Sequence, residues 1–322
     1  MARILILVLA VVIAALAPSA LRAQPLQRAV ITYSSRSIAS VDLFIAQERG
    51  FFREEGIEPQ LVQISANAAI AATVSGDVQA LGSVGSAIRA IQRGVPIKVL
   101  AVSLHRPLFW LVTRPDLKSF ADLKGKVAAT TTIGGSQHTA GIRMLRRAGI
   151  DPDKDITVMT AGDVPTQLKA MVSGTIQIGF FSPPSVIIAR DKYKMNVLAS
   201  AMDEFSSLQN GLGMLEKNLK EQRELARRML RARAKGNRYF HQNERGSAEV
   251  LAKYLNVDMP TALETYRISL PAFTTNGIPS DDEIREYLKM DAQIIGLPAP
   301  VPAEKIFDFA LQREVNKELG MK

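Results

Sequence analysis

The hexapeptide Val74-Ser-Gly-Asp-Val-Gln79 returns 98 residues later as Val172-Ser-Gly-Thr-Ile-Gln177. Each copy follows a segment whose apolar residues have helical spacing, and each leads into a short apolar segment typical of a strand. A helix, a turn and a strand that recur at a fixed offset indicate two similar α/β lobes rather than one continuous sheet.

Outward from this repeat, short apolar runs alternate with longer helical patterns, which predicts mostly parallel sheets covered by helices. The expected strands are 29–33, 60–64, 80–81, 98–102, 109–113, 127–131, 156–159, 177–180 and 197–199. The expected helices are 38–49, 68–74, 86–93, 137–148, 164–173 and 184–191. After Leu215 the pattern is nearly all helical.

Composition excludes several classes of protein. The 322 residues are 47% hydrophobic and 22% charged, which fits one large or two medium globular domains and not a disordered chain. The absence of cysteine excludes disulfides, thiolate metal sites, cysteine nucleophiles and a lipid anchor on an N-terminal cysteine. With three histidines and no HExxH or GxSxG motif, we expect no catalytic residue, no metal and no cofactor.

The N-terminus has the pattern of a secretory signal peptide. Arg3 precedes an unbroken apolar run at 4–17, and small residues follow up to Ala23, after which we expect cleavage. The run would span about 21 Å as a helix, less than the roughly 30 Å of a bilayer core, which disfavours an uncleaved anchor. Removal of 1–23 lowers the formal net charge from +9 to +7, and no lipid anchor is expected.

The densest basic stretch, 216–238, has two interpretations, a nucleic-acid surface or the solvated face of a helix. Acidic residues alternate with its arginines, and its apolar residues fall on one side of a helical wheel. We therefore expect a helix face and no nucleic-acid partner. The remaining positive charge favours anionic ligands or an anionic membrane surface through long-range attraction.

Three further segments carry a resemblance to a known family. They are Ala46-Gln-Glu-Arg-Gly-Phe-Phe-Arg-Glu-Glu-Gly-Ile57, Asp122-Leu-Lys-Gly-Lys-Val127, and the stretch from Gly149-Ile-Asp-Pro-Asp-Lys-Asp155 to Ser173-Gly174. Together they resemble type II periplasmic solute-binding proteins of ABC importers, in the branch of sulfonate-, taurine- and nitrate-binding proteins and thiamine-pyrimidine synthases. The chain departs from that family at Gln79 and Gln177, where aspartate is usual, and we expect a structural role for both glutamines.

The resemblance implies a two-lobed α/β clamp in which each lobe is a mixed, mostly parallel sheet flanked by helices. It implies a first lobe of 24–113 with a helical return at 206–322, a second lobe of 114–205, and crossings near 109–114 and 200–213. A monomer in the periplasm would close around a small organic solute, expected to be anionic, and deliver it to an ABC permease in the inner membrane.

Two alternative functions share this fold. One is a sensor partner that presents bound solute to a membrane receptor. The other is an enzyme related to thiamine-pyrimidine synthesis, which we disfavour because the cysteine-rich iron motif of that branch is impossible in a chain without cysteine.

Loops that follow strands are the expected ligand site, because ligands of open α/β sheets lie beyond the carboxyl ends of the strands. Helix N-termini in those loops expose N–H groups and partial positive charge, which suits an anion. An alternative role for serines there is helix capping, and the two roles are compatible. The small polar candidates are Ser34, Ser35, Asn67, Ser83, Thr132, Gly135, Ser136, Ser182 and Asn210.

Three larger side chains complete the candidate ligand-binding set. Arg36 could pair with an anion or be a solvated loop residue, and His105 could contact ligand or make a structural hydrogen bond. Phe181 is expected to form an aromatic wall of the cleft while its neighbour Phe180 enters the core, because successive strand residues face opposite sides.

Overall fold

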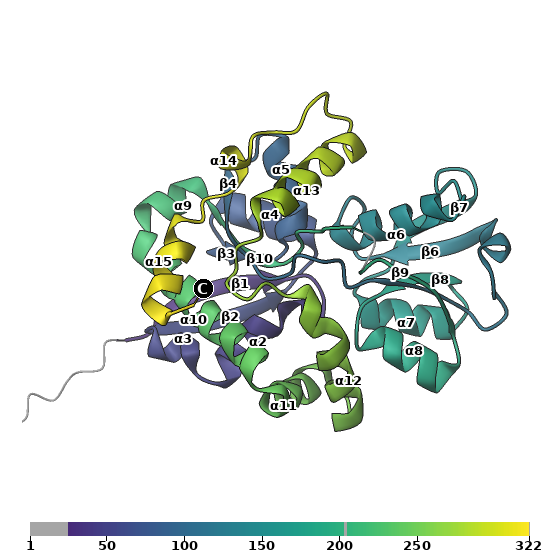
Figure 1. The fold of residues 1–322 in the computed structure, drawn as a ribbon, viewed down its shortest axis with the longest axis horizontal. Helices are drawn as coiled ribbons and strands as arrows, with labels where there is room; N and C mark the ends of the chain where they lie inside the picture. Colours follow the sequence, from purple (N-terminus) through teal and green to yellow (C-terminus); the bar gives the residue numbers. More distant parts are fainter. Residues whose placement is uncertain (1–24, 203–204, 322) are drawn as a thin grey trace, which may run out of the picture.

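The computed structural model describes residues 25–202 and 205–321. The expected signal peptide at 1–23 lies outside the described residues. Within them, no helix combines the length and apolar character needed to cross a bilayer. Figure 1 shows two lobes side by side, with the second sheet and its helices in teal on the right and the remaining elements on the left.

The two sheets have the same architecture. In the first, the strand order is β2-β1-β3-β10-β4, and β10 is antiparallel to its neighbours β3 and β4. In the second, the order is β7-β6-β8-β5-β9, and β5 is antiparallel to β8 and β9. The first sheet contains β1 (Gln27–Tyr33), β2 (Ile57–Gln63), β3 (Ala80–Leu81), β4 (Ile97–Val102) and β10 (Gly211–Leu215). The second contains β5 (Trp110–Thr113), β6 (Lys126–Thr130), β7 (Ile156–Thr160), β8 (Ile178–Phe181) and β9 (Asn196–Ser200).

Helices cover both faces of each sheet, as the sequence pattern predicts. The helices near the N-terminus are η1 (Ile38–Ser40), α2 (Val41–Glu48), α3 (Phe51–Glu54), α4 (Ala66–Ser75) and α5 (Val84–Gln92). The second lobe has η2 (Phe120–Leu123), α6 (Ser136–Arg147), α7 (Val164–Val172) and α8 (Ser185–Tyr193). The remaining helices are α9 (Glu216–Glu221), α10 (Arg223–Gln242), α11 (Glu244–Leu255), α12 (Met259–Ser269), η3 (Leu270–Ala272), α13 (Asp281–Ile294), α14 (Ala303–Ile306) and α15 (Ala310–Leu319).

The helical C-terminal part packs against the first sheet, as expected. Leu43 of α2, Met229 of α10 and Leu311 of α15 share one buried cluster with strand residues of this sheet. Ile88 of α5 and Tyr287 of α13 belong to a second cluster. The apolar stripe of the long helical segment is therefore buried in the first lobe, which gives this lobe a larger core than the second.

The strand pairings correct the expected position of the first crossing. Strand β5 was expected to end the first lobe, but it pairs with β8 and β9 in the second sheet. The chain therefore changes lobes before Trp110. The returning strand β10 is absent from the expected elements, because its glycine-rich sequence lacks a strand pattern. Glycine is required there, since a Cβ on Gly211 would overlap the carbonyl oxygen of Ala101 on β4.

The glutamines that open β3 and β8 play the same structural role in both lobes, as expected. Gln79 Oε1 accepts a hydrogen bond from Val30 N–H at 2.8 Å, and Gln177 Oε1 accepts one from Val127 N–H at 3.0 Å. Each glutamine also donates its own backbone N–H to the carbonyl of that same valine. Each side chain thus fastens the start of one strand to its parallel neighbour, and the sequence repeat corresponds to a structural repeat.

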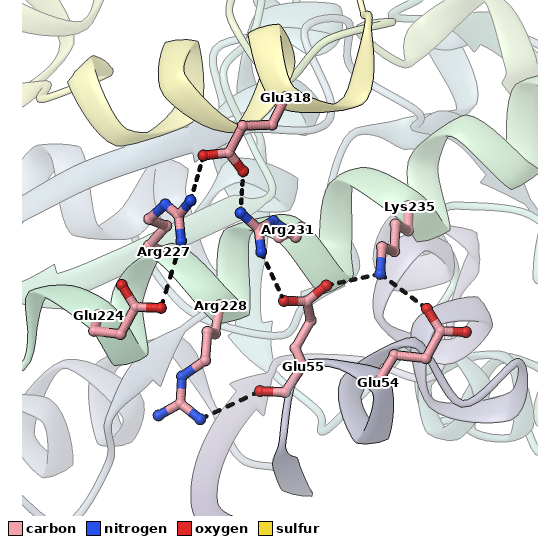
Figure 2. Close-up of polar contacts among 8 residues, drawn as sticks. All are labelled: Glu54, Glu55, Glu224, Arg227, Arg228, Arg231, Lys235 and Glu318. Atoms are coloured by element: carbon pink, nitrogen blue, oxygen red, sulfur yellow. Dashed lines mark hydrogen bonds and ion pairs between the residues drawn. The ribbon is translucent and has the colours of Figure 1, made fainter.

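The basic face of α10 was expected to be solvated, but several of its cations form ion pairs with neighbouring helices. Figure 2 shows that Arg227 and Arg231 both pair with Glu318 of α15, while Arg231 and Lys235 pair with Glu55 beside α3. Arg233 is buried altogether, with 4% exposure, and pairs with buried Asp42 of α2 at 2.6 Å. These cations join α10 to its neighbours, and ion pairing neutralises much of this charge.

Candidate ligand-binding site

A small cavity, with about 50 Å³ of space that water can occupy, lies between the lobes. Both lobes and both crossings contribute to its wall, as expected for loops at the carboxyl ends of parallel strands. The first lobe contributes Ser34, Ser35, Ser37, Ala39, Ala66, Ser83 and Ser86. The second contributes Thr131, Thr132, Gly135, Ser136, Gln137, Val164 and Ser182. The crossings contribute Leu108, Phe109, Gln209 and Asn210.

Most residues that line the cavity are polar and several are apolar, and none of the described ones has an ionisable carboxylate, amine, guanidinium or imidazole. Four helices begin at the cavity. Ala66 is the first residue of α4 and Val164 the first of α7, while Ser83 precedes α5 and Gly135 precedes α6. Each N-terminus contributes partial positive charge, although the carboxylate of Asp163, which caps α7, offsets that of α7.

Two hydroxyls in this wall are unusual. Ser83 Oγ of the first lobe and Thr132 Oγ1 of the second are buried, and neither has a hydrogen-bond partner among the described residues. Their residues are only 6% and 5% exposed. A buried hydroxyl without a partner is costly, so both side chains are suited to binding a polar group within the cavity.

Other polar side chains of the wall are fixed by structural hydrogen bonds. Gln137 donates to the carbonyl of Phe180 at 2.7 Å and accepts from the N–H of Thr131 at 2.7 Å, which fastens the loop before α6 to the end of β8. Asn210 donates to Ser40 Oγ at 3.2 Å. These contacts hold the wall in place, whereas the hydroxyls of Ser83 and Thr132 take no part in them.

Eight of the twelve expected site residues line this cavity. They are Ser34, Ser35, Ser83, Thr132, Gly135, Ser136, Ser182 and Asn210. Capping accounts for some of the serines that line it and not for others. Ser37 caps η1, and Ser35 Oγ accepts from the N–H of Val164, the first residue of α7. Ser83 makes no capping hydrogen bond, and Ser136 is the first residue of α6.

The other four expected residues lie outside the cavity wall. Arg36 and Asn67 have exposed side chains. His105 makes a 2.7 Å contact through Nδ1 with Glu283 of α13, which is the structural alternative.

Phe181 does not form the expected aromatic wall, because helices cover both faces of the second sheet. Phe180 packs in the cluster that contains residues of α6, and Phe181 packs in the cluster on the side of α7 and α8. Both rings are fully buried. The aromatic residue in the cavity wall is instead Phe109, which the crossing presents. The sequence feature that could have identified Phe109 is its position at the start of the predicted crossing between the lobes.

No group of three or more histidine, cysteine, aspartate or glutamate side chains suited to a metal ion occurs in 25–202 or 205–321. The described lining residues therefore offer hydroxyls, amides, backbone N–H groups and the ring of Phe109. Such groups bind and orient a small molecule.

The two lobes and the cavity between them define a protein of the periplasmic-binding-protein fold. Residues 38–246 match the family described as NMT1/THI5 like, and the chain belongs to that family.

Comparisons with individual proteins agree with this class. The riboflavin-binding protein RibY of Chloroflexus aurantiacus is 28% identical over 199 residues, which are 60% of this chain and 56% of RibY. The chain thus spans little more than half the length of this curated relative.

Two solved structures show the same fold at low identity. The alkanesulfonate-binding protein SsuA of Xanthomonas axonopodis, solved with bound MOPS, has a TM-score of 0.72 at 16% identity, covering 87% of this chain and 98% of SsuA. The desulfurization enzyme DSZB has a TM-score of 0.68 at 12% identity, covering 91% of this chain and 99% of DSZB. The fold is therefore shared by binding proteins and an enzyme.

Proposed function

We propose that this protein captures a small organic anion between its lobes and delivers it to an ABC permease, as a monomer exported to the periplasm by a cleavable signal peptide. The observation that supports this most directly is the pair of unpartnered hydroxyls, Ser83 Oγ and Thr132 Oγ1, which line one cavity from opposite lobes. A ligand oxygen that accepts from both would give each hydroxyl its missing hydrogen-bond partner and would join the two lobes.

The ligand is expected to be an anion because of the four helix N-termini around the cavity. Their partial charges favour a sulfonate, a carboxylate or nitrate over a cation, with α4, α5 and α6 contributing most because the Asp163 carboxylate offsets the charge at the start of α7. Phe109 offers an apolar surface beside these donors, which fits an anionic group attached to a ring or a short alkyl chain.

A binding role is favoured over an enzymatic one because the described residues of the cavity wall include no candidate acid or base, and no metal-binding cluster occurs in the described parts of the chain. Serine hydroxyls alone are weak nucleophiles without an adjacent base. Ligand capture by hinge closure needs only the hydrogen bonds and the two lobes.

A thermal-shift screen of residues 24–322 tests this function. The panel contains sulfonates, carboxylates, aromatic acids, nitrate, pyrimidines and riboflavin, and each acid is paired with its neutral amide. A true ligand present at one hundred times its Kd should add about 2.7 kcal/mol to the free energy of unfolding. Stabilisation by neutral or cationic compounds alone would contradict the assignment of an anion.

Delivery to a permease and presentation to a sensor both require the same ligand-bound form. Permease and ATPase genes beside the gene for this chain would support uptake, whereas a receptor-kinase gene would support sensing. Stimulation of a reconstituted permease ATPase by the ligand-bound protein, and not by the free protein, would establish delivery.

A further inference from the structure

Side-chain hydrogen bonds connect the two lobes at several points, and two of them lie beside the cavity. Ser35 Oγ accepts from the Val164 N–H at 3.3 Å, and Arg89 donates to the carbonyl oxygen of Gly134. Gln63 donates to Asp163 at 2.8 Å and Arg190 pairs with Glu264 at 2.9 Å, but both contacts are exposed. Arg89 of α5 is different, because it is 4% exposed and donates from Nη1 to the carbonyl oxygen of Gly134 in the second lobe.

Arg89 is held within the first lobe by a fixed carboxylate. Its Nε and Nη2 atoms donate to Asp291 Oδ1 of α13 at 2.8 and 2.6 Å. Gln92 donates to the other oxygen of Asp291 at 3.0 Å, and Asp291 itself is fully buried. Because a guanidinium is planar and rigid, fixing its Nε–Nη2 edge also fixes the direction of Nη1.

The acceptor of that remaining donor belongs to the loop that carries Thr132. Gly134 lies between cavity residues Thr132 and Gly135, and Gly135 donates its N–H to the carbonyl of Thr132 at 3.0 Å. Arg89 lies on α5, the helix that Ser83 precedes. Arg89 therefore connects the two walls that carry the unpaired hydroxyls, although it does not line the cavity.

We propose that Arg89 is a positioning residue that favours the arrangement in which Ser83 and Thr132 face one ligand, an inference that rests on the proposed function. When the lobes separate, Arg89 would keep its ion pair with Asp291, and its Nη1 would donate to water in place of the Gly134 carbonyl. Arg89 is therefore preorganised for closure. Loss of a hydrogen bond from a charged donor should weaken closure, and with it ligand affinity, about 10- to 100-fold.

The test measures closure without any ligand. Gln63 and Asp163 are in side-chain contact across the lobes, and the chain has no other cysteine, so any disulfide in Q63C/D163C can join only these two positions and requires the lobes to approach. The equilibrium of this disulfide with glutathione gives the effective concentration of one thiol at the other, which reports how often the lobes come together. Strain in this disulfide is common to every background and cancels from the ratio.

Two changes at Arg89 are compared in the Q63C/D163C background. R89K keeps a positive charge next to Asp291 but lacks the planar fork, and R89M/D291L replaces the whole buried pair with apolar side chains, a change that often leaves folding intact. Both should lower the effective concentration about 10- to 100-fold. R190Q, which removes an exposed contact between the lobes, is the control and should lower it less than about 5-fold.

An effective concentration within twofold of the background in folded R89K and in folded R89M/D291L would overturn the proposal. An equal drop in R190Q would also overturn it, because Arg89 would then have no special role. Since the assay contains no ligand, a failed ligand screen would leave this result unaffected and would count against the proposed function alone.

Discussion

The two lobes share a scaffold but differ in the loops that the scaffold presents. Both sheets have the same strand order, and both use a glutamine to fasten two parallel strands. Yet Ser83 and Phe181, which occupy matching positions 98 residues apart in the repeat, differ in location. Ser83 lies in the cavity wall and Phe181 in the core. The repeat therefore determines where loops lie, and the individual loop residues determine what the cavity can bind.

The largest effect is expected from truncation of a core ring of the second lobe. F181A should lower the free energy of unfolding by about 3–5 kcal/mol, because a fully buried ring leaves a cavity. Urea denaturation monitored by circular dichroism measures this. S83A at the matching position of the first lobe is the control and should change stability by less than about 1 kcal/mol. Similar losses for F181A and S83A would show that the two positions do not differ in this way.

The glutamine bridges provide a matched pair of intermediate effects. Q79A and Q177A should each cost about 1–2 kcal/mol, since each leaves a valine N–H of the neighbouring strand without its partner. The loss should be slightly larger for Q177A, because Gln177 also donates to the carbonyl of Gly174. If only one of the two variants loses stability, the structural repeat has no energetic counterpart.

The unpaired hydroxyls should affect binding without affecting folding. S83A and T132A should each weaken the ligand identified by the screen by up to about 10-fold, as expected for a lost hydrogen bond. Unfolding of the free protein should be unchanged or shifted to slightly higher temperature, because an unsatisfied buried hydroxyl is removed. Calorimetric titration measures the affinities. Wild-type affinity in both variants would exclude these hydroxyls from the site.

The smallest effect concerns pH and again separates the lobes. Helix α4 is capped by Ser65 and helix α7, 98 residues later, by Asp163. Burial raises the pKa of Asp163, but hydrogen bonds from Thr166, Gln63 and the backbone of Arg36 outweigh it and hold the pKa below its usual value.

A lowered folded-state pKa means that Asp163 stabilises the folded protein above its ordinary pKa and that this contribution is lost as the pH falls from about 4. Because the carboxylate is half exposed, the effect should not exceed about 1 kcal/mol. Denaturation of wild type and D163S at pH 7 and pH 3 measures it. The variant, which copies the cap of the first lobe, should lose less stability than wild type on acidification; an equal loss would assign the effect to other groups.

Sequence reasoning could predict the features that depend on short-range pattern. The repeat around Gln79 and Gln177, the alternation of strands and helices, and the serine-rich loops after strands all correspond to observed elements. These features follow from local turn chemistry and from the rule that parallel strands end at a common edge.

What the sequence could not predict depends on contacts between distant segments. Strand β10 exists because Gly211 can approach Ala101, and no local pattern records that approach. The burial of Phe181 depends on α7 and α8 covering the second face of its sheet. The pairing of Arg89 with Asp291 joins residues 202 positions apart, beyond the reach of any periodicity.

The two crossings between the lobes have a mechanical consequence. They run beside one another and are hydrogen-bonded, with N–H groups of Ala201, Ser207 and Gln209 donating to carbonyls of Phe109, His105 and Leu104. Two joined segments behave as one ribbon, which bends across its face far more readily than it shears in its plane. We therefore expect any relative movement of the lobes to have a single rotational degree of freedom, so that Ser83 and Thr132 would meet in one register each time the cavity closes.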